Sequence, residues 1–347
     1  MSSVQDTVQY VRLGKSGLRV SVPIFGAMSL GSSKWAPWAL EGDEAIRVLK
    51  AAWDRGINTF DTANMYSNGE SEKVLGNFIE KCNIPRNEIL ILTKCYHLVH
   101  KEPNVHGPLR PELKDLREYV NKTGLSRAGI FNAVEDSLAR LKTTYIDLLQ
   151  IHRFDSNVEP EETMKALHDL VQSGKVRYIG ASSMRAWQFA MLNEIAEKNG
   201  WTKFVSMQNE YSLLYREEER EMNAYCNHNG IGLIPWAPIA GGLLARPIDQ
   251  AGTTRSEFIK GVGMAEPLSE SDKAIINRVQ EIAQKRGKSM AQVASAWVNA
   301  KVSSPILGLA GEKRVEEAVG INGLTLTEEE MKYLEEPYQP KVVRGHA

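Results

Sequence analysis

The stretch RAGIFNAVEDSLARLKTTYIDLLQIH, residues 127–152, shows the unit from which the fold is built. Its first part, Arg127–Leu141, places apolar residues at helical spacing and follows Ser126, a residue type that favours helix N-termini. Its second part, Ile146–Leu149, is a short apolar run with the length of a buried strand. A helix followed by a buried strand is typical of proteins with a parallel sheet.

The same alternation extends along the whole chain in both directions. Eight short apolar runs predict strands: Val22–Phe25, Ile57–Phe60, Ile89–Leu92, Ile146–Leu149, Val176–Ile179, Phe204–Met207, Ile231–Ile234 and Pro305–Leu307. Helical patterns lie between them: one that follows Gly42-Asp43, then Glu72–Lys81, Arg127–Leu141, Glu161–Gln172, Trp187–Lys198, Glu217–His228 and Met290–Asn299. We expect Asp43, Ser71, Ser126 and Ser183 to cap helix N-termini.

Two folds compete for this pattern, a (β/α)8 barrel and an open doubly wound sheet. The open sheet usually carries G-x-G-x-x-G after an early strand. The first strand here ends in Gly26-Ala-Met-Ser-Leu-Gly31, which lacks that spacing. The sequence therefore predicts an α/β protein with a (β/α)8 TIM barrel, a single domain over residues 1–347.

Three further segments should surround the barrel. Gly14-Lys15-Ser16-Gly17 predicts the turn of an N-terminal β-hairpin that covers one barrel end. Tyr96–Leu125 and Ile239–Ser271 each follow a strand and are long for connections. We expect both to form loops at the C-terminal face of the barrel, where active sites of this fold lie.

Composition narrows the classes of function. The 347 residues include 42 Lys and Arg against 43 Asp and Glu, a net charge of −1. This balance gives no reason to expect nucleic acid or an anionic membrane as a partner and favours a small-molecule substrate. The three cysteines, Cys82, Cys95 and Cys226, have no disulfide or zinc spacing, so we expect no metal. With no signal core or membrane-length apolar run, the sequence predicts a cytoplasmic protein.

Four polar residues stand at the ends of three successive strands. Asp61 follows the second strand, Tyr66 lies on the loop after it, Lys94 ends the third strand and His152 follows the fourth. Neighbouring strand ends meet at one mouth of a barrel, so the four side chains should converge. We expect Lys94 to lower the pKa of Tyr66, Asp61 to keep Lys94 charged, and His152 to bind a carbonyl oxygen. A cofactor must then supply hydride, since no side chain can.

Each of these residues also has a purely structural interpretation. Asp61 suits a turn, Tyr66 a half-buried aromatic position, Lys94 a barrel rim, and His152 an ordinary hydrogen bond. The interpretation as a site rests on their joint occurrence, because four unrelated accidents would have to coincide at three successive strand ends.

These residues lie in segments that resemble the aldo-keto reductase family. Phe60-Asp-Thr-Ala-Asn-Met-Tyr66, Leu92-Thr-Lys94 and Asp147-Leu-Leu-Gln-Ile-His152 are similar to its signature segments, and the likeness extends from Val11 to Tyr338. Within the family the chain resembles fungal aryl-alcohol dehydrogenase-like and versiconal reductase-like members. The resemblance implies a barrel, NADPH bound without a Rossmann domain, and catalytic roles for Asp61, Tyr66, Lys94 and His152.

The resemblance also implies positions that contact the cofactor. They are Gly26, Ala27 and Met28 beside the nicotinamide ribose, Ser182, Ser183 and Gln208 at the carboxamide, Trp236 stacked on the nicotinamide, Pro238, Gly241 and Leu243 over the pyrophosphate, and Lys313, Arg314 and Glu317 at the adenosine end. Ser183 stands where many members have Asn. Arg314 suits a 2′-phosphate and favours NADPH over NADH, although a solvated helix position is the alternative.

Aromatic residues predict the wall of a substrate pocket. Met28 and Tyr66 are joined there by Trp35, Trp38, Tyr96 and His97. Such a wall suits a flat aromatic or apolar carbonyl compound. Trp35 and Trp38 have the alternative of packing beneath the hairpin.

Three functions remain open on the sequence. The first is NADPH-dependent reduction of an aldehyde or ketone, aromatic or polyketide-derived, with the proton taken from Tyr66. The second is a cofactor-sensing regulatory subunit that resembles the β subunits of ion channels. The third is an isomerase or aldolase that forms a Schiff base on Lys94, which a carboxylate partner at Asp61 disfavours.

Overall fold

Eight parallel strands form one curled sheet in the computed structural model, which describes residues 8–250, 252–261 and 267–346. The strands are β3 (Ile24–Gly26), β4 (Thr59–Asp61), β5 (Leu90–Cys95), β6 (Ile146–Ile151), β7 (Val176–Ser182), β8 (Ser206–Gln208), β9 (Gly232–Leu233) and β10 (Ile306–Gly308). Their order is β10-β3-β4-β5-β6-β7-β8-β9. The backbone amide of Ile306 donates to the carbonyl of Pro235 at 3.0 Å and joins the two ends of the sheet. The predicted (β/α)8 barrel is confirmed.

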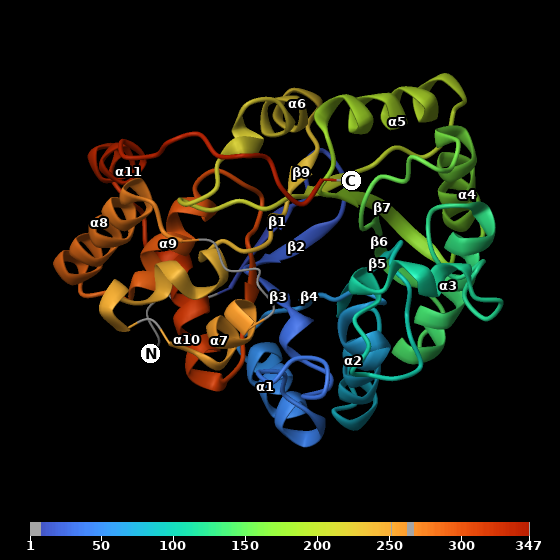
Figure 1. The fold of residues 1–347 in the computed structure, drawn as a ribbon, viewed down its shortest axis with the longest axis horizontal. Helices are drawn as coiled ribbons and strands as arrows, with labels where there is room; N and C mark the ends of the chain where they lie inside the picture. The colour runs from blue at the N-terminus through green and yellow to red at the C-terminus, as the bar shows by residue number, and fades with distance from the viewer. Residues whose placement is uncertain (1–7, 251, 262–266, 347) are drawn as a thin grey trace.

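A ring of helices covers the outside of the sheet (Figure 1). They are α1 (Gly42–Asp54), α2 (Glu70–Lys81), α3 (Arg127–Leu141), α4 (Pro160–Gln172), α5 (Ala186–Lys198), α6 (Met222–Asn229), α7 (Thr254–Gly261), α8 (Glu270–Arg286), α9 (Met290–Asn299), α10 (Glu312–Val319) and α11 (Glu328–Glu335). Within the described ranges, no helix has the length and apolar character needed to cross a membrane.

Helix α3 shows how the sequence forms these helices. Ile130, Val134, Leu138 and Leu141 recur at helical spacing and are buried against the sheet. The Ser126 hydroxyl accepts a hydrogen bond from the Gly129 amide at 3.1 Å, which satisfies one free donor of the first turn. The helix packs on the outer face of the sheet against β5, between α2 and α4.

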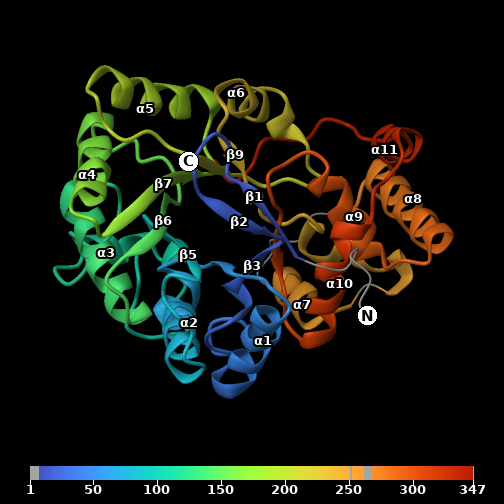
Figure 2. The same ribbon diagram turned by 180° about the vertical axis from the view of Figure 1, so that it is seen from behind.

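The N-terminal hairpin closes the end of the barrel opposite the site, as Figure 2 shows. Strands β1 (Gln9–Arg12) and β2 (Arg19–Val22) pair antiparallel around the predicted turn. Leu13, Leu18 and Val20 are buried among side chains of the barrel strands, including Leu92 and Leu148. The hairpin therefore fills the barrel floor with apolar groups, and the predicted N-terminal hairpin is confirmed.

Three of the predicted N-caps are wrong. The cap of α1 is Glu41, that of α2 is Gly69 and that of α5 is Arg185. Asp43 lies inside α1, and the Ser71 hydroxyl donates instead to the carbonyl of Ala27 at 2.8 Å. Ser183 lies before Arg185 and therefore outside α5, and its hydroxyl accepts a hydrogen bond from the Trp236 indole.

The two long connections differ from each other. Tyr96–Leu125 is irregular apart from two short 3-10 segments, Gly107–Leu109 and Pro111–Asp115. The other stretch, expected as a loop to Ser271, contains α7 and the beginning of α8. Part of that stretch, residue 251 and residues 262–266, lies outside the described residues.

Candidate active site

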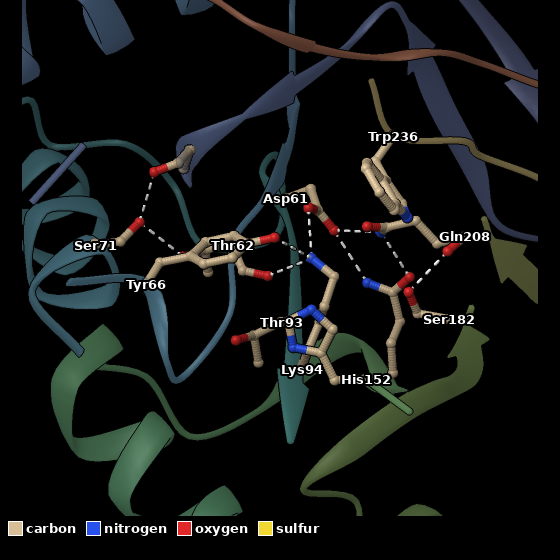
Figure 3. Close-up of polar contacts among 12 residues, drawn as sticks. Asp61, Thr62, Tyr66, Ser71, Thr93, Lys94, His152, Ser182, Gln208 and Trp236 are labelled. Carbon is tan, nitrogen blue, oxygen red and sulfur yellow. Dashed lines mark hydrogen bonds and ion pairs between the residues drawn. The ribbon is translucent and has the colours of Figure 1, made fainter. Parts of the chain in front are cut away.

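A buried lysine connects an aspartate and a tyrosine at the ends of β4 and β5. The Lys94 amine donates to Asp61 Oδ2 at 2.7 Å, to the Thr62 carbonyl at 2.9 Å and to the Tyr66 hydroxyl at 3.3 Å (Figure 3). Only 1% of Lys94 and 2% of Asp61 are exposed. The structure thus brings a phenol, an ammonium and a carboxylate to one place, and all three donors of the ammonium are used.

Two glutamines complete the surroundings of Asp61. Gln150 Nε2 donates to Asp61 Oδ1 at 3.0 Å, and Gln208 Nε2 donates to the same oxygen at 2.7 Å. Gln208 Nε2 also lies 2.8 Å from Gln150 Oε1. The carboxylate therefore has a partner at each oxygen, which fixes its direction toward Lys94. Gln150 was not among the predicted site residues, although a lone amide inside the apolar run Ile146–Ile151 was a signal for it.

The electrostatics of the tyrosine differ from the expectation. Burial raises the pKa of Tyr66 above its ordinary value, and the charge of Lys94 opposes this only in part. Lys94 lowers the pKa of Tyr66 as expected, but the net direction is upward because the loss of hydration outweighs the nearby ammonium. Burial is the largest single influence and lowers the pKa of Lys94, but the charges and hydrogen bonds of Asp61 and Tyr66 together raise it above its ordinary value, so the amine stays protonated. A protonated Lys94 argues against a Schiff base.

His152 joins the group from the end of β6. Its ring lies edge-on to Tyr66 with centroids 6.1 Å apart, and edge-on to His97 at 4.8 Å. Burial, aided by His97 and Lys94, holds the pKa of His152 well below its usual range, so the imidazole is neutral. Its Nδ1 is buried and has no hydrogen-bond partner among the described residues. All four predicted catalytic residues therefore lie together.

The predicted substrate residues form two groups around Tyr66. Trp35 and Trp38 belong to one apolar cluster that also contacts Met28 and Tyr66. Tyr96 lies edge-on to His97 at 5.0 Å, and His97 continues to His152. The tryptophans therefore lie at the site rather than beneath the hairpin.

Ser183, Trp236, Ser182 and Gln208 are joined by hydrogen bonds. The half-exposed indole of Trp236 donates to the Ser183 hydroxyl at 3.1 Å, and Ser183 has a positive φ of 40°. The Ser182 hydroxyl donates to the Gln208 carbonyl at 2.7 Å. These contacts fix the tryptophan and the serines in place and leave Gln208 Oε1 without a partner other than solvent among the described residues.

The other predicted cofactor residues lie in three places. Gly26 ends β3, and Ala27 and Met28 begin the 3-10 turn after it. Pro238, Gly241 and Leu243 lie on the segment after β9, where the 3-10 turn Ala240–Ala245 contains two glycines of positive φ. Lys313 and Arg314 are exposed on α10, and Glu317 lies half-buried one turn further.

An arginine on α7 was missed by the sequence analysis. The guanidinium of Arg255 lies over the Trp38 ring at 5.7 Å, and its buried Nε has no partner among the described residues. Burial lowers the pKa of Arg255, and the like charge of Arg314 lowers it further. Two arginines close enough to repel each other favour an anion between them. On the same helix, Phe258 contacts Trp38 at 5.1 Å.

The C-terminal tail crosses the mouth of the barrel after α11, as the red segment of Figure 1 shows. Arg344 pairs with Glu210 at 2.7 Å, and Lys341 pairs with Asp272 at 2.6 Å. A Cβ on Gly345 would lie 3.8 Å from Trp236 Cζ2. Ion pairs therefore hold the tail against the Trp236 indole, for which the family resemblance implies stacking on nicotinamide.

A (β/α)8 barrel with a tyrosine, a lysine, an aspartate and a histidine together at its mouth defines a class of barrel enzymes. Comparison with known proteins identifies the family. The sequence profile of the aldo/keto reductase family matches residues 24–339. The chain is 52% identical to an aldo-keto reductase of Fusarium vanettenii over 98% of this chain and 94% of the relative. It is 50% identical to a versiconal hemiacetal acetate reductase of Aspergillus parasiticus, over 97% of this chain and 98% of that protein. It is also 50% identical to a putative aryl-alcohol dehydrogenase of Schizosaccharomyces pombe, over 99% of both.

The chain therefore belongs to the aldo/keto reductase family and is an oxidoreductase that acts on small carbonyl compounds or the corresponding alcohols. The resemblance seen in the sequence is confirmed over nearly the whole chain. Among the described residues, no group of three or more His, Cys, Asp or Glu side chains could hold a metal ion.

Proposed function

We propose that this protein reduces an aldehyde or ketone to an alcohol with NADPH and that Tyr66 donates the proton. The observation that carries the proposal is the buried chain of contacts from Asp61 through Lys94 to the Tyr66 hydroxyl, at 2.7 Å and 3.3 Å. No other group of the site combines an acidic hydrogen with an adjacent fixed cation. NADPH, when bound, supplies the hydride.

The direction of the Tyr66 pKa supports its role as an acid. Because burial raises this pKa, the hydroxyl carries its proton at neutral pH and has it available for transfer. When the carbonyl oxygen gains negative charge, the proton of the Tyr66 hydroxyl moves to that oxygen. The phenolate left behind lies next to the Lys94 ammonium, which Asp61 keeps charged. Lys94 thus stabilises the charge that develops during the reaction.

His152 orients the carbonyl group in this proposal. A neutral imidazole can donate one hydrogen bond without competing with Lys94 for negative charge. The low pKa of His152 keeps it neutral, and no described residue binds its side chain. A carbonyl oxygen between His152 and the Tyr66 hydroxyl would therefore accept a hydrogen bond from each.

The described residues fit a nicotinamide cofactor with a 2′-phosphate. Arg255 and Arg314 provide two guanidinium groups that repel each other, and the buried Nε of Arg255 has no partner among the described residues, which suits a dianionic phosphate better than a hydroxyl. The Trp236 indole, fixed by Ser183, offers a flat face for nicotinamide, and Gln208 Oε1 offers an acceptor for its carboxamide. The remaining contacts that we propose are those of Gly26, Ala27, Met28, Ser182, Pro238, Gly241, Leu243, Lys313 and Glu317.

We further propose that the substrate is aromatic or polyketide-derived. Trp35, Trp38 and Met28 give Tyr66 an apolar wall, which favours flat and weakly polar compounds. Two relatives have names that refer to compounds of these kinds, versiconal hemiacetal acetate and aryl alcohols. The free thiols of Cys82, Cys95 and Cys226 fit a reducing compartment such as the cytoplasm.

The test is the substitution Tyr66→Phe, which removes only the hydroxyl. We expect turnover of benzaldehyde to be lost while NADPH binding, followed by fluorescence titration, is unchanged. Tyr10→Phe is the matched control, because Tyr10 lies on hairpin strand β1 and its hydroxyl donates to the carbonyl of Gly56, after α1, at 2.7 Å. Undiminished NADPH oxidation by Tyr66→Phe would contradict the proposal. Tight NADPH binding with no turnover by the wild type would favour the regulatory alternative.

A further inference from the structure

Arg153, the residue after His152, is a half-buried cation at the mouth of the barrel. No carboxylate among the described residues forms an ion pair with its guanidinium. One of its terminal nitrogens, Nη1, donates to the His152 carbonyl at 2.6 Å. The guanidinium makes no other hydrogen bond and no ion pair with any described residue. A guanidinium has five donors, so most of its capacity remains for a ligand.

The groups around Arg153 are those of the proposed reaction. Burial lowers the pKa of Arg153, while Tyr66, Tyr96 and Glu210 act on it in the opposite direction. Arg153 in turn contributes to the low pKa of His97, which burial and this cation hold at about 4. The guanidinium therefore lies within electrostatic range of the Tyr66 hydroxyl.

Glu210, the carboxylate whose charge acts on Arg153, is already paired with another arginine. Glu210 receives hydrogen bonds from Arg344 Nε at 3.1 Å and Arg344 Nη2 at 2.7 Å. This fork occupies both of its oxygens, so Glu210 compensates the charge of the tail before that of Arg153. A partly dehydrated cation in such surroundings gains most from an external carboxylate.

The cofactor phosphates are a poor match for this position. Arg153 follows β6, whereas Arg314 belongs to α10, which comes after β10. In the sheet order β10-β3-β4-β5-β6, three strands separate these two, so the positions lie far apart around the mouth. The anion at Arg153 must therefore belong to the substrate.

We infer that Arg153 binds a carboxylate of the substrate, and that the preferred substrates are carbonyl compounds with a carboxylate close to the reacting carbonyl. In such a compound the carbonyl oxygen lies between Tyr66 and His152 while the carboxylate accepts from the guanidinium. Trp35 and Trp38 contact the rest of the molecule. The inference rests on the proposed function, since it names the substrate class of the same site.

The experiment compares phenylglyoxylate with its methyl ester, which shares the ring and the activated ketone and lacks only the charge. We expect the wild type to have the higher kcat/KM for the acid. Arg153→Met should lower kcat/KM for the acid by about 10- to 100-fold, mainly through KM, and change the ester by less than about 3-fold. The kcat/KM of Arg153→Lys for the acid should lie between those of the wild type and Arg153→Met. Arg47→Met, on exposed α1, is the control for loss of a positive charge.

Other results would overturn the inference. An equal loss for acid and ester in Arg153→Met would show that Arg153 only positions His152 or tunes Tyr66. A wild type that reduces the ester and not the acid would also contradict it. If neither compound is reduced, the proposed function fails separately, and calorimetric binding of mandelate still decides the role of Arg153. Equal affinity of wild type and Arg153→Met for mandelate would then contradict the inference that Arg153 binds a carboxylate.

Discussion

Replacing Asp61 by Asn tests whether the buried ion pair works as the structure indicates. The substitution keeps the size and one oxygen of the side chain, so Gln150 and Gln208 retain an acceptor. It removes the charge that compensates Lys94, of which only 1% is exposed. A buried charge left without its partner typically costs about 3–5 kcal/mol of unfolding free energy. In a chain of 347 residues that corresponds to a fall in Tm of about 4–7 °C.

The unfolding free energies of the wild type and of Asp61→Asn should change with pH in opposite directions. In the wild type the folded pKa of Lys94 is raised, so the stabilisation by the pair is complete below the unfolded pKa of about 10.4 and is lost above the folded pKa. In Asp61→Asn, only the contact with Tyr66 still opposes burial, and we expect the folded pKa of Lys94 to fall below the unfolded one. The variant then gains stability as pH rises toward about 10. The difference between the two proteins should therefore be largest near pH 7 and shrink between pH 8 and 10.

The assay is urea unfolding at pH 7 and pH 10, followed by circular dichroism. Asp61→Asn combined with Lys94→Met should recover part of the lost stability, because no uncompensated charge remains. Asp54→Asn is the matched control, since the Lys50–Asp54 pair at 2.6 Å is about half exposed and contributes less than about 1 kcal/mol. Equal midpoints for wild type and Asp61→Asn at pH 7, or a double variant less stable than the single one, would refute this reasoning.

Three more outcomes are expected. Arg314→Ala should raise the dissociation constant of NADPH by about 10-fold and leave that of NADH unchanged, as fluorescence titration will show; equal effects on both would remove the phosphate contact. Burial holds the pKa of His97 at about 4, below that of the unfolded chain, so stability should fall as pH drops from about 6.5 toward 4. His97→Gln should lessen that fall, measured as urea midpoints at pH 7 and 5, and an unchanged slope would count against it. Burial raises the pKa of Cys95 and Cys226 to about 12, so iodoacetamide at pH 8 should label Cys82 first by mass spectrometry; prior labelling of Cys95 would contradict the burial.

The eight strands were predictable because each is a short apolar run between polar segments. The strand ends differ from the predicted ones by one to three residues, since pairing with neighbours decides where a strand ends. Helix α8 was missed although its signals were present: Ser269 and Asp272 form a capping box, and Ile275, Val279 and Ile282 recur on one buried side. The predicted loop ran to Ser271, past the first residue of α8, so the N-terminal signals of this helix were not recognised. Helices α10 and α11, with eight residues each, are too short to be stable without packing and give a weak signal.

The site was predictable to the extent that its residues stand at strand ends. Topology alone brought Asp61, Lys94 and His152 to one mouth. The direction of the Tyr66 pKa was not predictable, because it depends on how much water the surrounding loops exclude. Arg255 was equally inaccessible, since its neighbours come from segments more than fifty residues away and no spacing in the sequence connects them.

The position of the C-terminal tail has a practical consequence for handling the protein. Gly345 lies beside Trp236, and the ion pairs of Lys341 and Arg344 keep it there. An affinity tag or fluorescent fusion attached after this tail would emerge at the entrance used by small molecules and obstruct their passage. The hairpin of β1 and β2 lies at the opposite end of the barrel, away from that entrance.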